Sequence, residues 1–164
     1  MRTKSNIFSI LAGLLFIPLA SCSEGETYSR FYQVENGKWY RDSLLVFTMD
    51  SLISVSGTGY NVTIELTTNR SYPYRDLWLQ IDQDLADSLV RTDTFRCLLA
   101  DEHGKWLGSG AGGLNQLSLA YLSFIPRDSV YHYRLTIRQA MNDDPLRGVE
   151  KVGVKVIKSN HVNY

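Results

Sequence analysis

Strict alternation of apolar and polar residues is the feature that most constrains the fold of this chain. In YNVTIELT, residues 60–67, every second side chain is apolar and the residues between them are polar. A period of two places the apolar side chains on one face of a β-strand and the polar side chains on the other. VYHYRLTIRQ (130–139) and EKVGVKVIK (150–158) repeat the pattern, so all three segments are predicted to be half-buried strands. The side chains expected to point inward are Tyr60, Val62, Ile64, Leu66, Tyr131, Tyr133, Leu135, Ile137, Val152, Val154 and Val156.

Weaker strand signals bring the expected total to about eight. They lie at residues 28–34, 43–49, 76–82, 94–101 and 117–125, with turn-forming clusters between them. Only 83–90 and 138–144 have the composition for a helical turn or two. Many short strands, frequent turns and almost no helix predict an all-β chain folded as an antiparallel β-sandwich.

The N-terminus has the layout of an export signal. Arg2 and Lys4 precede an apolar run at 7–19, and LASC follows at 19–22. The run is too short to span a bilayer comfortably, and small residues before a cysteine are typical of a bacterial lipobox. We therefore expect a signal peptide at 1–21, a lipidated tether at 22–27 beginning with acylated Cys22, and a single domain at 28–164. An ordinary signal peptide with a chance cysteine is the alternative.

Charge and cysteine content exclude several classes of partner and chemistry. Removal of Arg2 and Lys4 with the signal leaves 15 basic against 17 acidic residues, a net charge of −2. Nucleic acid requires a basic surface, so it is not an expected partner. With Cys22 acylated, Cys97 has no cysteine left to pair with. Cys97 alternates with Phe95 and Leu99, which favours a small core residue over a nucleophile.

The glycines of HGKWLGSGAGGLNQ (103–116) spell G-x-G-x-x-G at 108–113. A dinucleotide loop must follow a strand and open a helix, whose N-terminus holds the pyrophosphate. Here an expected strand follows, so neither a nucleotide nor any other cofactor is predicted. We expect the segment 106–113 at one end of the sandwich. Trp106 would anchor it over the core, or alternatively the segment would dock against a partner.

No arrangement of residues marks a catalytic or metal centre. His103, His132 and His161 are scattered, and His132 falls on the polar face of its strand. Asp82, Asp84 and Asp87 begin like a calcium loop, but the glycine and closing glutamate are missing, so no metal is expected. Asp143 and Asp144 before Pro145 are read as a turn. The chain is predicted not to be an enzyme, with a small hydrolase as a remote alternative.

Surplus aromatic residues are the more informative surface signal. Trp78 lies opposite Leu77 and Leu79 in the strand pattern, while Tyr72, Tyr74 and Trp106 belong to corners and loops. Such rings combine a large apolar area with a polar tip, so they can stack on sugars or anchor a protein. The four are therefore expected contact residues for a glycan or partner, with burial in the core as the alternative.

Three sequence blocks give the chain a family resemblance. They are YPYRDLWLQI (72–81), LADEHGKWLGSGAGG (99–113) and FIPRDSVYHYRLTIRQAMNDDPLRGVEKVGVKV (124–156). In this order after a lipobox they resemble the gliding-motility-associated lipoprotein GldH family of the Bacteroidetes.

The resemblance implies a lipid-anchored, non-enzymatic subunit of an envelope assembly for gliding motility and the linked type IX secretion system. Its expected place is the outer membrane, anchored by acyl chains such as palmitate and facing the periplasm or the surface. Its expected partners are other motility or secretion lipoproteins. Of the family's functional residues, only the acylated cysteine carries over, onto Cys22. The alternative is a carbohydrate-binding β-sandwich lipoprotein.

Four Asp-Ser-apolar triplets add a modification hypothesis. DSL and DSV resemble the O-glycosylation sequon of the Bacteroidetes, although Asp and Ser are also common in ordinary turns. The serines concerned are Ser43, Ser51, Ser88 and Ser129.

Overall fold

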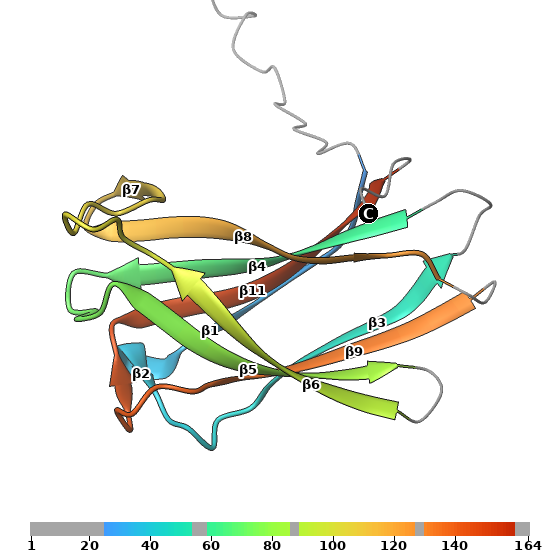
Figure 1. Cartoon of the computed structure of the whole chain (residues 1–164), viewed down its shortest axis with the longest axis horizontal. Helices are drawn as coiled ribbons and strands as arrows, with labels where there is room; N and C mark the ends of the chain where they lie inside the picture. The colour runs from blue at the N-terminus through green and yellow to red at the C-terminus, as the bar shows by residue number, and fades with distance from the viewer. Residues whose placement is uncertain (1–24, 54–58, 86–88, 127–129, 160–164) are drawn as a thin grey trace, which may run out of the picture.

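The computed structural model describes residues 25–53, 59–85, 89–126 and 130–159. In this part of the chain two antiparallel sheets pack face to face, as Figure 1 shows. The first has the order β1 (Glu26–Gln33), β11 (Val149–Ser159), β4 (Gly59–Asn69), β8 (Leu114–Phe124) and β7 (Ser109–Ala111). The second has the order β3 (Leu45–Ile53), β9 (Val130–Gln139), β5 (Asp76–Leu85) and β6 (Leu89–Leu98). The predicted antiparallel sandwich is confirmed.

The eight long strands are the eight that the sequence predicts, and three short ones were not foreseen. β7 extends one sheet edge, while β2 (Lys38–Trp39) and β10 (Leu146–Arg147) form a separate ribbon. The helical turn expected at 83–90 is wrong, because residues 83–85 and 89–90 belong to β5 and β6. Residues 138–139 end β9, and a 3-10 turn at Glu35–Gly37 is the single helical element in the described ranges. None of the described segments forms a helix long and apolar enough for a membrane crossing.

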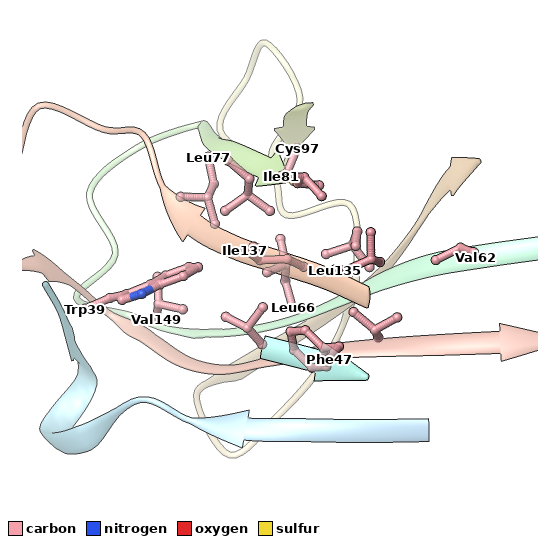
Figure 2. Close-up of a cluster of buried hydrophobic side chains, with 14 of the residues drawn as sticks. Trp39, Phe47, Val62, Leu66, Leu77, Ile81, Cys97, Leu135, Ile137 and Val149 are labelled. Carbon is pink, nitrogen blue, oxygen red and sulfur yellow. The ribbon is translucent and has the colours of Figure 1, made fainter. Parts of the chain in front are cut away.

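The core lies between the sheets and follows the predicted alternation. Tyr60, Val62, Ile64 and Leu66 are all buried, as are the three inward valines of β11. On β9 the pattern holds from Tyr133 to Ile137, while the side chain of Tyr131 lies outside the described part. Figure 2 shows the apolar side chains of both layers meeting between the ribbons. Burial of about 25 cal/mol per Å2 of apolar surface stabilises this arrangement.

A polar chain also joins the two sheets along one side. Tyr133 Oη donates to Gln83 Oε1 at 2.8 Å, and Gln83 Nε2 donates to Asp93. Tyr121, on β8 of the other sheet, donates to Asp93 Oδ2 at 2.9 Å. Buried polar groups need such partners to offset desolvation. This series of hydrogen bonds therefore holds β6 against β8 at the margin of the sandwich.

The first strand begins at one end of the sandwich, and four long connections lie at the other. Glu26 pairs with Ile157, near the end of β11, whereas Gln33 pairs with Lys151 at its beginning. β1 begins at Glu26, so the last two residues of the expected tether are in fact part of a strand. The connections at 34–44, 70–75, 99–108 and 140–148 gather with the β7 hairpin at the opposite end, on the left in Figure 1. We call this the loop end.

Candidate functional site

The loop end has the highest concentration of exposed apolar side chains. Five of the eleven large hydrophobic residues that are exposed in the described ranges lie there, and Trp78 lies close by, near the start of β5. The five are Tyr40, Leu44, Tyr74, Leu107 and Leu114. Scattered surface hydrophobics are ordinary, but a concentration on one end of a small domain is typical of an interaction surface.

Long-range hydrogen bonds hold these loops in fixed positions. Arg41 Nη2 donates to the carbonyl oxygens of Met141 and Asn142, both at 2.9 Å. The backbone N–H of Arg41 donates to Asp144 Oδ1 at 3.0 Å. Guanidinium groups suit this role because they present several donors in a rigid plane. The bend predicted at 143–144 is therefore tied to a loop about 100 residues earlier in the chain.

Tyr74 adds a second tie to the same bend. Its hydroxyl donates to Asp143 Oδ2 at 2.8 Å, and this hydrogen bond raises the pKa of Tyr74. The ring remains partly exposed. It thus presents an oriented aromatic face without being part of the core, and its role as a contact residue stays a prediction.

Tyr72 behaves differently, and its assignment as a surface contact is wrong. It is 4% exposed, and its hydroxyl donates to the Asp76 carbonyl at 2.7 Å. Burial raises its pKa. Its ring centroid lies 6.0 Å from that of Tyr74 and 6.3 Å from that of Trp106. Tyr72 therefore anchors the corner from inside, because the 70–75 loop folds inward over the end of the core.

Trp106 lies partly buried against the core, which agrees with the intramolecular reading of the glycine segment. It forms an isolated bridge with Ala100, and Leu107 N donates to Leu99 O at 2.9 Å. Farther along, Gly112 and Gly113 have φ of 62° and 85° and close the β7–β8 hairpin. Two consecutive positive φ angles are the signature of a two-residue type I′ turn. The glycines therefore close a hairpin that the sequence pattern does not predict, and a strand follows them as predicted. No helix follows that could bind a pyrophosphate.

Trp78 lies on the outward face of the second sheet, where the alternation placed it. It is 38% exposed, and the Arg96 guanidinium carbon lies 5.7 Å from its ring centroid. Arg96 also pairs with Asp76, with an N–O distance of 2.8 Å. Gln80, next on the same face, is in register with Thr94 and Arg138. The result is a polar sheet face with one indole ring near the loop end.

The residues weighed for catalysis or metal binding remain apart in the described structure. Cys97 is buried, and desolvation raises its pKa to about 12, which confirms a core role. His132 is on the exposed face of β9, as predicted. Asp82 and Asp84 lie along the extended strand β5, where Asp82 accepts from Thr92, while Asp87 lies outside the described residues. No cluster of three or more His, Cys, Asp or Glu side chains suited to a metal occurs among the residues described.

Of the predicted modification sites, the side chain of Ser43 is the one within the described residues. Cys22, Ser88 and Ser129 lie outside the described residues, as does the side chain of Ser51 in β3. Ser43 is exposed just before β3, and its carbonyl accepts from Trp39 Nε1 at 3.0 Å. Its hydroxyl is therefore accessible to a modifying enzyme, while the backbone around it is held in place.

Fold and site together define an all-β sandwich protein with a fixed, aromatic-rich loop surface at one end. The chain belongs to the GldH lipoprotein family, whose sequence model matches residues 26–156. It is 27% identical to the gliding motility lipoprotein GldH homolog of Christiangramia forsetii, covering 98% of this chain and 100% of the relative. It is 24% identical to the gliding motility lipoprotein GldH of Flavobacterium johnsoniae, covering 95% and 98%. A solved structure, dimeric latent PorU from Porphyromonas gingivalis, aligns with 80% of this chain and 13% of its own, at 13% identity and a TM-score of 0.34.

Proposed function

We propose that this chain is a lipid-anchored, non-enzymatic subunit of a cell-envelope assembly that supports gliding motility and the associated type IX secretion. The observation that carries the proposal is the near full-length similarity to two gliding motility lipoproteins. Its partners are other envelope lipoproteins or proteins of the same assembly. The body is a single sandwich domain, exported by the signal at 1–21 and attached to the outer membrane through acyl chains on Cys22.

The geometry supports a role in binding other proteins. β1 begins at Glu26, four residues after Cys22 in the sequence, so chain length alone keeps a lipid attachment at Cys22 within about 14 Å of that end of β1, opposite the loops. The loop end, with its fixed backbone and exposed aromatic rings, then faces away from the attachment point. Surfaces whose loops are already fixed bind at a lower cost in conformational entropy. This arrangement suits a subunit that presents a docking surface to neighbours in the periplasm or at the cell surface.

The anchor is directly testable. We expect the mature N-terminal peptide to begin at Cys22 and to carry diacylglyceryl and amide-linked acyl mass, because two or three chains give durable membrane attachment. Cys22→Ala should leave an uncleaved or soluble protein. In a secreting and gliding strain that depends on this gene, the variant should fail to restore either activity. A mature N-terminus elsewhere, found by mass spectrometry, would contradict the anchor, and full restoration by Cys22→Ala would contradict its role.

A carbohydrate-binding function is the second candidate, and Trp78 is the observation that favours it. On this sheet face an exposed indole can stack on a sugar ring, and the neighbouring arginine, glutamine and threonine side chains can hydrogen-bond its hydroxyls. Retention on a glycan array that is lost in Trp78→Ala would favour this function over protein assembly. Retention that survives the substitution would exclude this face as the binding site.

A further inference from the structure

Most of one sheet edge in the described structure lacks a neighbouring strand. β8 pairs with β4 along its whole length, but on its other side β7 covers only residues 114–116. Just before β7, Gly108 packs closely against the edge of β8. A Cβ at Gly108 would lie 2.0 Å from the carbonyl oxygen of Gln116. In the described structure, residues 117–123 therefore have a strand on one side only.

The hairpin turn fixes which backbone groups face the open side. In a two-residue hairpin the residues flanking the turn, here Ala111 and Leu114, form a hydrogen-bonded pair. Because bonding direction alternates along a strand, Gln116 also faces β7. By the same alternation, Ser118 and Ala120 direct their N–H and C=O groups away from β4, beyond the point where β7 ends. A bulge beside Thr63 ends this regular stretch after Ala120.

This edge also lacks the charges that protect the other edges of the sandwich. Residues 106–126 contain no charged side chain. By contrast, edge strand β1 carries Arg30, β3 carries Asp50 and β6 carries Arg91 and Arg96. Proteins commonly use charge or proline to prevent an edge strand from pairing with another chain. The edge of β8 is therefore the one of the four described long edges that is open to strand addition.

The interior is incompletely covered beneath the same edge. Leu117 and Leu119 point toward the core yet are only partly buried, and so is Phe95 on β6 of the opposite sheet. Phe95 contacts Tyr121 edge to face, with ring centroids 5.3 Å apart. An added strand with an apolar residue at every second position would continue the line of β7 and cover these side chains.

We propose that the open edge of β8 binds an extended, uncharged segment of a partner protein, which adds as a strand beside residues 117–120. This rests on the proposed function in two respects: the partner is an envelope protein, and the chain itself is attached to a membrane through Cys22. A second copy of the chain fits less well. Antiparallel pairing of β8 with itself would point the two Glu26 ends in opposite directions, whereas both copies are attached to one membrane.

Photocrosslinking in intact cells tests the proposal with the full, lipidated chain. A p-benzoylphenylalanine at Ser118 should crosslink to one contiguous segment of another polypeptide, identified by mass spectrometry. Thr94, which is exposed on the charged edge strand β6, is the matched control position. The same probe at Thr94 should not crosslink to that segment.

Edge substitutions then separate strand addition from mere proximity. Ala120→Lys should lower the crosslink yield about tenfold, since an unpaired charge at the edge opposes pairing. Ala120→Glu checks this with a charge of the opposite sign at the same exposed position, and Ser29→Lys, on the opposite edge of the same sheet, should leave the yield unchanged. Because these side chains are exposed, the melting temperatures should be retained.

A crosslink from Ser118 to a second copy, the absence of any crosslink, or a crosslink whose yield neither Ala120→Lys nor Ala120→Glu lowers would overturn the proposal. None of these outcomes bears on the proposed function, which depends on Cys22 and on the loop end. The two can therefore fail separately.

Discussion

Gly148→Ala is expected to lower the free energy of unfolding by about 3–5 kcal/mol, the largest effect of any single methyl addition we consider. Gly148 has φ of 84°, and a Cβ there would lie 2.3 Å from the backbone N of Tyr72 and 2.5 Å from its Cα. The clash is with backbone, so no side-chain rotation relieves it. Gly148 N also donates to Gly37 O, and Gly148 O accepts from Asn69 N, at 2.9 and 2.8 Å. Displacement would disturb both neighbouring loops.

Gly104→Ala is the matched control, because Gly104 has φ of 79° but no atom within 4 Å of its Cβ position. It should cost only the left-handed backbone penalty of about 1 kcal/mol. Urea unfolding of both variants measures the difference. Equal losses would show that the contact with Tyr72 has no energetic consequence and that the loop end is looser than its hydrogen bonds indicate.

Trp39→Ala should destabilise the protein by about 3–5 kcal/mol, as expected for a fully buried tryptophan. Trp39 is 1% exposed, pairs with Leu146 in the β2–β10 ribbon, and donates from Nε1 to Ser43 O. Figure 2 shows its ring beside Val149 at the margin of the core. The substitution would leave a cavity and remove the hydrogen bond that orders the approach to β3.

Trp78→Ala removes the same side chain from an exposed sheet face, so it should cost less than about 1 kcal/mol. Thermal unfolding and urea titration compare the two variants directly. Similar losses, or a larger loss for Trp78, would contradict the assignment of Trp39 to the core and of Trp78 to the surface. Comparing the two losses therefore distinguishes a tryptophan that stabilises the fold from one whose side chain is free to contact a partner.

The sequence predicts the sheets well, because each strand carries its own evidence. Alternation in 60–67 and 150–158 identifies the buried face of β4 and β11 without knowledge of their neighbours. It also places Trp78 outward and Cys97 inward. Local pattern is sufficient wherever one face of a strand is buried and the other meets water.

The loop end is much less predictable, because contacts between distant segments determine it. Arg41 donates hydrogen bonds to carbonyl oxygens about 100 residues away in the sequence. No local pattern in the segment YRDS (40–43) predicts these hydrogen bonds. Tyr72 and Tyr74 look alike in the sequence, yet one is buried and the other exposed, because only the corner's path over the core distinguishes them. The burial of Trp39 is not predictable from the sequence either, because a two-residue strand has no periodicity. A glycine after a turn, such as Gly148, is a local signal for a special backbone conformation. The close contact with Tyr72 that makes this glycine necessary is not visible in the sequence.

Crosslinking mass spectrometry on intact cells tests the central claim most directly, namely that the chain is an anchored subunit that binds other envelope proteins through its loop end. Lys38 and Lys105 are exposed at that end, whereas Lys158 lies near the start of β1. With an amine-reactive crosslinker, Lys38 and Lys105 are predicted to join reproducibly to other envelope proteins more often than Lys158 does. Cys22→Ala should abolish these products. Absence of any crosslinked envelope protein, together with retention on a glycan array that depends on Trp78, would contradict the claim and favour carbohydrate binding.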